Sequence, residues 1–99
     1  MKNSEVHDAF WQKQIACTAH LTSTGEKLIS YQTCIAQRSE NPLTYFINMT
    51  YYSNTTSRQQ HAVLRKAIAK VGEKNVIELD NIPRDTRDLI YYVNHKYGK

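Results

Sequence analysis

The basic side chains in the second half of the chain are the residues most able to bind a partner. The chain has 99 residues and a formal net charge of +4. Residues 1–40 hold four basic and four acidic side chains, so the whole excess lies in residues 41–99. Five basic residues fall between positions 54 and 74, where Glu73 is the one acidic residue: Arg58, Arg65, Lys66, Lys70 and Lys74. We treat these five as candidate partner-binding residues, because such a surface binds phosphates or an acidic protein; the alternative is a solvated helix face.

Cysteine and histidine supply the other reactive groups. Cys17, His20 and Cys34 could form a zinc site, but strand alternation places Cys17 and His20 on opposite faces of a sheet, which disfavours it. We expect Cys17 to face the core and Cys34 the other side, which predicts no disulfide. The histidines are scattered, and the glycines at 25, 72 and 98 form no phosphate loop. We therefore expect no metal, no cofactor and no enzymatic activity.

A helix that ends at Val71 must position the cations. Asn54 to Ser57 are four consecutive residues of types that cap helices, and Ser57 with Gln60 fits a capping box, as does Thr56 with Gln59. Gly72 provides the stop. One apolar stripe is predicted on this helix: Leu64, Ala67, Ile68 and Val71, with Val63 at its edge.

The remaining elements follow from hydrophobic alternation and periodicity. We expect a short helix over 4–14, a hairpin over 15–35 that turns near residues 23–26, a loop over 37–42 and a third strand over 43–52. The hairpin register that buries both apolar rows pairs Leu21 with Ile29 and Cys17 with Thr33. A short strand over 75–79 and a last helix from 84 or 85 to 97 complete the chain.

These elements predict a single α+β domain over residues 1–99. The order α-β-β-β-α, then a short strand and a C-terminal helix, favours a three-stranded antiparallel sheet with helices packed on one face. The order resembles that of double-stranded-RNA-binding domains, and Phe46 and Tyr52 on the open sheet face could stack on bases. No apolar run is long enough for a membrane span and the N-terminus lacks a signal peptide, so we expect a cytoplasmic protein.

Two segments carry a resemblance to a family. Residues 31–36 read Tyr-Gln-Thr-Cys-Ile-Ala, and residues 52–60 read Tyr-Ser-Asn-Thr-Thr-Ser-Arg-Gln-Gln. This pattern, over about residues 25–64, resembles short uncharacterised proteins encoded by phages, prophages and plasmids of Gram-positive bacteria. The resemblance implies a context in a bacterial host cell, where small proteins of such elements are often inhibitors of host defence. Several are anti-CRISPR proteins that block a Cas nuclease.

Two functions from different classes are therefore expected. The first is a host-directed inhibitor of the anti-CRISPR type that binds Cas9 or its complex with guide RNA and blocks it without catalysis. The second is a small basic accessory protein that binds nucleic acid through Arg58, Arg65, Lys66 and Lys70. The net positive charge argues against mimicry of DNA by the first kind of protein. The chain is expected to act as a monomer or a dimer.

Overall fold

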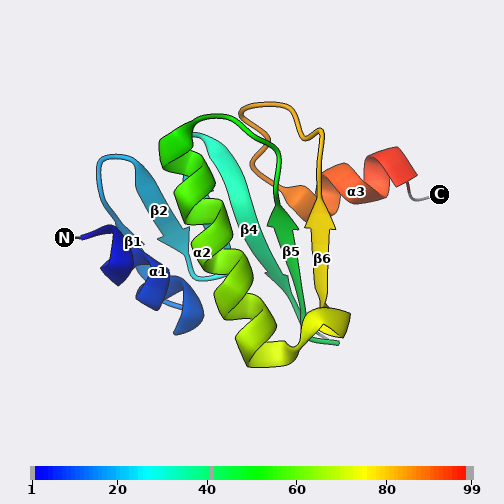
Figure 1. The fold of residues 1–99 in the computed structure, drawn as a ribbon, viewed down its shortest axis with the longest axis horizontal. Helices are drawn as coiled ribbons and strands as arrows, with labels where there is room; N and C mark the ends of the chain where they lie inside the picture. Colours follow the sequence, from blue (N-terminus) through cyan, green and yellow to red (C-terminus); the bar gives the residue numbers. More distant parts are fainter. Residues whose placement is uncertain (1, 41, 98–99) are drawn as a thin grey trace.

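A six-stranded mixed sheet with three α-helices forms the fold (Figure 1). The computed structural model describes residues 2–40 and 42–97, with the backbone alone for 95–97. The described elements are α1 (Asn3–Trp11), β1 (Ile15–Cys17), β2 (Leu21–Thr24), β3 (Lys27–Ser30), β4 (Thr33–Ser39), β5 (Thr44–Asn48), α2 (Asn54–Val71), the 3-10 turn η1 (Glu73–Asn75), β6 (Val76–Leu79) and α3 (Leu89–Tyr97). The α+β class agrees with the sequence prediction, whereas three strands was an undercount.

The strands follow one another across the sheet in chain order, from β1 to β6. Neighbours from β1 to β5 are antiparallel, and β6 pairs with β5 in parallel. A parallel pair needs a long crossover, which α2 provides. The predicted hairpin over 15–35 was too simple, because the chain reverses again at Thr18, whose hydroxyl accepts the N–H groups of His20 and Leu21. The turn predicted near residues 23–26 is confirmed between β2 and β3.

The predicted strand register was wrong. Leu21 pairs with Ser30 and not with Ile29, so Leu21 and Ile29 lie on opposite faces of the sheet. In β4 the register shifts beside Ile35, which is the signature of a β-bulge. The extra residue lets Ile35 and Ala36 both pack into the core on one face.

Helices cover both faces of the sheet, and not one face as the sequence predicted. α1 and α2 cover the first face, and α2 crosses in front of the central strands in Figure 1. The first core holds the buried residues Val6, Phe10, Leu21, Leu28, Ile35, Ala36, Tyr45, Ile47, Val63 and Ala67. α3 packs on the other face over the second core, which holds Cys34, Ile82 and Leu89 with Ile29, Phe46, Leu79 and Tyr92 around them. Phe46, which was expected to lie on an open sheet face and stack on bases, is therefore partly covered. The sheet also has six strands and not the three of the α-β-β-β-α order seen in double-stranded-RNA-binding domains.

The segment predicted as a loop over 37–42 begins as buried strand. Gln37 and Arg38 are both inside β4 and almost fully buried. Arg38 donates to the carbonyl oxygens of Phe10 and Gly25 and to the hydroxyl of Tyr45. Its guanidinium also lies over the Phe10 ring, 4.7 Å from the centroid. Arg38 therefore ties the C-terminal turn of α1 and the β2–β3 turn to the centre of the sheet.

The last helix begins at Leu89, which is later than predicted. The side chain of Gln37 binds the backbone at the start of this helix. Gln37 Oε1 accepts the N–H of Leu89 at 2.6 Å, and its amide donates to Asp88. Asp88 in turn accepts the N–H of Tyr91. The side chains of residues 95–97 and Gly98, which the sequence placed at the end of this helix, lie outside the described residues. None of the described helices combines the length and apolarity that crossing a bilayer requires.

Candidate functional site: the cationic side of α2

Polar contacts fix how α2 is rotated about its axis. Ser53 is the N-cap, and its hydroxyl accepts the N–H of Thr56 at 3.1 Å. Both predicted capping boxes were wrong, because Ser53 is the N-cap and Thr56 and Ser57 lie inside the helix. Gln59 instead shares a hydrogen bond with His7. Gln60 donates to the carbonyl oxygens of Asn48 and Thr50 at 2.6 and 2.8 Å. These bonds hold the first half of the helix against the end of β5.

The buried stripe of α2 is correspondingly more polar than predicted. Thr56, Gln60, Val63 and Ala67 are the fully buried residues, whereas Leu64, Ile68 and Val71 are only partly buried. The centre of the stripe is displaced from the predicted one by about one residue position, from Leu64 to Val63. Gly72 ends the helix with φ of 82°, as predicted.

All five predicted partner-binding residues are exposed. Arg58, Arg65, Lys66 and Lys70 lie on α2, and Lys74 lies in η1 directly after it. Within residues 2–40 and 42–97, the ion pairs join Lys13 to Glu40 and Lys27 to Asp88, and neither involves these five cations. Their charge is therefore not neutralised by this chain in the described part, and it is available to a partner.

The five cations do not form one cluster. At 100° per residue, Arg58 and Arg65 lie seven positions apart and share the outward side of α2. Lys66 and Lys70 lie on the flank that faces α1, where Lys70 Nζ stands 5.7 Å from the centroid of the Trp11 ring. The structure thus divides the predicted site into an outward pair, a pair beside α1, and Lys74 at the end.

A groove of about 410 Å³ runs between α1 and α2 beside this second pair. Its walls are Asn3, Ser4, His7, Asp8 and Trp11 of α1 with Gln59, Ala62 and Lys66 of α2. Trp11 is partly buried, and its ring packs edge-on against Phe10 and Tyr45 at 4.9 and 5.2 Å between centroids. Two ring contacts therefore hold the indole in the wall of the groove while part of it stays accessible.

His7 closes the groove between the two helices. Its Nε2 shares a hydrogen bond with Oε1 of Gln59 across the helix interface. Burial lowers the pKa of His7, and this outweighs the opposing effects of Gln59 and Asp8, so the ring is neutral at pH 7. Positive charge in the groove thus comes from the lysines of α2.

Apart from Lys66, the groove residues were missed because the sequence gives no signal of their proximity. Trp11 and Lys70 are far apart along the chain, and His7 and Gln59 are separated by 52 positions.

Cys17 does not face the core as predicted, whereas Cys34 lies on the other face of the sheet as predicted, where α3 buries it. Cys17 is exposed, and Cys34 is buried in the second core, where its thiol donates to the carbonyl oxygen of Ala36. Burial raises the pKa of Cys34 to about 12, so the thiol is protonated and inert as a nucleophile. In the described part of the chain, no three His, Cys, Asp or Glu residues gather closely enough to hold a metal ion.

Comparisons with known proteins supply no relative from which a role could be carried over. No family model matches the chain, and neither a curated protein nor a solved structure matches it. The functional argument therefore rests on the geometry of the cationic side of α2 and the groove beside it.

Proposed function

We propose that the protein is a non-catalytic binding protein that holds single-stranded nucleic acid along the cationic side of α2. One observation supports this most: five exposed cations without an ion-pair partner among the described residues follow α2 and η1, and two of them, Lys66 and Lys70, lie beside a groove that Trp11 lines. Proteins that bind single strands combine cations for the phosphates with aromatic rings on which bases stack. Both components occur here on one surface.

The dimensions of the surface suit a short strand. From Arg58 to Lys70 the cations on α2 extend over about 18 Å at 1.5 Å per residue, and Lys74 follows in η1. Lys66 lines the groove on the α2 side and Lys70 Nζ lies 5.7 Å from the centroid of the Trp11 ring, whereas Asp8 lines the α1 side. A phosphate would therefore sit over α2, and the base attached to it could reach Trp11.

Salt dependence of binding tests the proposal. A labelled single strand would be titrated with the full chain, by fluorescence anisotropy, over a series of salt concentrations. Five phosphate contacts predict that log K falls against log salt with a slope of about −3.5, since each contact contributes about −0.7. The variant K66A/K70A should reduce the slope to about −2.1.

A charge-matched variant provides the control. K13A/R87A also removes two cations, but these lie away from α2. Lys13 pairs with Glu40, and Arg87 donates to the side chain of Gln32. It should leave the slope near −3.5. Equal slopes for the two variants would mean that net charge alone drives binding and that α2 is only a solvated face. Trp11 is the single tryptophan, so quenching of its emission by the strand reports contact with the groove.

A second candidate function comes from the resemblance of residues 25–64 to proteins of mobile elements. In that case the protein is an inhibitor of the anti-CRISPR type, and the same cations bind an acidic patch of Cas9 or its guide RNA. Such an inhibitor would block DNA cleavage by the Cas9–guide complex and co-elute with it. It would also leave free single strands unbound at physiological salt. Binding of free strands without any effect on cleavage would instead support the nucleic-acid-binding function and exclude the inhibitor.

A further inference from the structure

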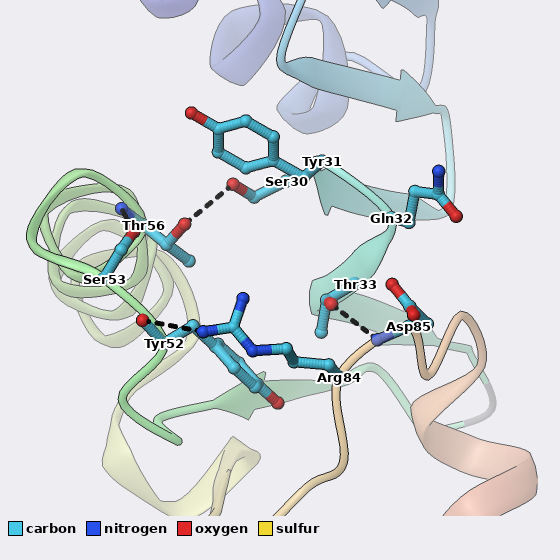
Figure 2. Close-up of a pocket in the computed structure, with 9 residues that line it drawn as sticks. All are labelled: Ser30, Tyr31, Gln32, Thr33, Tyr52, Ser53, Thr56, Arg84 and Asp85. Carbon is cyan, nitrogen blue, oxygen red and sulfur yellow. Dashed lines mark hydrogen bonds between the residues drawn. The ribbon is translucent and has the colours of Figure 1, made fainter.

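A second pocket lies away from the cationic side of α2, where the β3–β4 turn, the start of α2 and the β6–α3 loop meet. Its volume is about 420 Å³, within the range of small-ligand sites. The lining residues are Ser30, Tyr31, Gln32, Thr33, Tyr52, Ser53, Thr56, Arg84 and Asp85, drawn in Figure 2. The two sequence segments that carry the resemblance, which begin at Tyr31 and Tyr52, come together here.

Arg84 brings positive charge into this pocket. Its Nη2 donates to the carbonyl oxygen of Tyr52 at 3.1 Å, and its guanidinium carbon lies 5.7 Å from the centroid of the Tyr52 ring. These contacts hold the group in place but use one of its five N–H donors. Figure 2 shows the guanidinium in the open space between Tyr52 and Ser30. The remaining donors can pair with two oxygens of one oxyanion.

The hydroxyl groups around the pocket are set up to donate. Thr33 Oγ1 already accepts the N–H of Asp85 at 2.8 Å, and Ser53 Oγ already accepts the N–H of Thr56. Each hydroxyl keeps its own hydrogen, for which no acceptor lies among the residues that the structure describes. Ser30 and Thr56 bond to each other at 3.2 Å, which leaves one further hydrogen. The wall therefore offers several donors in addition to Arg84.

An aromatic ring stands at the mouth of the pocket. The Tyr31 side chain is 56% exposed, and Figure 2 shows its ring on the side of the pocket opposite Arg84. The ring of His20 packs beside it at 4.8 Å between centroids, and the N–H of Tyr31 donates to the carbonyl oxygen of His20. These contacts fix the position of the phenol ring while leaving much of it available for stacking.

We propose that this pocket binds a phosphate monoester that carries a flat ring, of the size of a mononucleotide. Arg84 and the hydroxyls of Ser53 and Thr33 bind the phosphate, and the flat ring stacks on Tyr31. Asp85 also lines the pocket, and Figure 2 shows its carboxylate beside Thr33 and away from the guanidinium. Its negative charge repels the phosphate of the ligand. Removal of this charge should therefore tighten binding, whereas removal of the Arg84 charge should weaken it. The inference does not depend on the proposed function, because Arg84 is not on α2.

The full-length protein would be titrated with AMP, inorganic phosphate and adenosine, and followed by the amide resonances of residues 30–33 and 52–56 in NMR spectra. AMP should saturate the site and bind about tenfold or more tightly than either fragment. Arg84→Gln should weaken AMP at least about tenfold. Asp85→Asn should tighten it by up to about fivefold, and Asn tolerates the positive φ of 65° at this position.

Arg87→Gln is the matched control, because Arg87 lies in the same loop but does not line the pocket. It should leave the AMP affinity unchanged. The proposal is overturned if AMP fails to saturate in the millimolar range, if R84Q and R87Q weaken AMP equally, or if inorganic phosphate binds as tightly as AMP. K66A/K70A should leave AMP binding unaffected, so failure of this inference is distinguishable from failure of the nucleic-acid proposal.

Discussion

Replacing Arg38 with Met should destabilise the protein by more than a typical substitution. Arg38 is 3% exposed and donates to two buried carbonyl oxygens, of Phe10 and Gly25, besides the hydroxyl of Tyr45. Met has a similar length and no donor, so the Gly25 oxygen loses the Arg38 bond, and the Phe10 oxygen keeps the N–H of Lys13 at 3.2 Å. Each desolvated and unpaired acceptor costs about 1–3 kcal/mol. Removal of a buried charge that has no carboxylate partner in the described chain offsets part of this cost.

Two acceptors together give a range of about 2–6 kcal/mol. We expect Arg38→Met to lower the unfolding free energy by about 3 kcal/mol, in the lower half of this range, because removal of the buried charge offsets part of the cost. In a domain of this size, 1 kcal/mol corresponds to about 4–8 °C in Tm, so Tm should fall by about 12–24 °C. Urea and thermal unfolding followed by Trp11 fluorescence would measure the change. Trp11 is a suitable reporter because it packs against Phe10 and Tyr45, two of the residues that Arg38 contacts.

Arg65→Met is the matched control, because Arg65 is exposed on α2, and it should shift stability by less than about 0.5 kcal/mol. Arg38→Lys keeps the charge but cannot span both carbonyl groups, so it should recover only part of the loss. A loss at Arg38→Met below about 1 kcal/mol would refute the reasoning, because it would mean that the two carbonyl groups find other partners.

Three further predictions concern the contacts that hold the helices. Gln60→Leu should cost about 1–3 kcal/mol in urea unfolding, because the carbonyl groups of Asn48 and Thr50 lose their donor, whereas His61→Leu on the exposed side should cost little. Burial would raise the pKa of Asp88, but the N–H of Tyr91, the amide of Gln37 and Lys27 outweigh it and hold the pKa below its ordinary value. The stability this gives is present above about pH 4 and is lost as pH falls through the lowered pKa, so Asp88→Asn should flatten acid unfolding monitored by circular dichroism. Iodoacetamide should modify Cys17 quickly and Cys34 only after unfolding, as mass spectrometry would show; rapid labelling of both in the native protein would contradict the second core.

The sequence alone determined the elements whose signals are local. Helix α2 and its end at Gly72 follow from a periodic stripe and a residue that accepts positive φ. The β2–β3 turn and the exposure of the five cations likewise follow from alternation and charge. These features depend on neighbours within a few positions, which is why they could be predicted.

Only the tertiary structure decided how the elements combine. A one-residue difference in register and a β-bulge at Ile35 placed Ile29 on the second face beside Cys34, where α3 packs. Buried polar side chains such as Gln37 and Arg38 are read from sequence as loop, because burial of a polar group becomes favourable only when distant partners satisfy it. The groove at Trp11 and the pocket at Arg84 arise in the same way: each joins segments far apart in the chain, and such proximity is set by packing and not by local sequence.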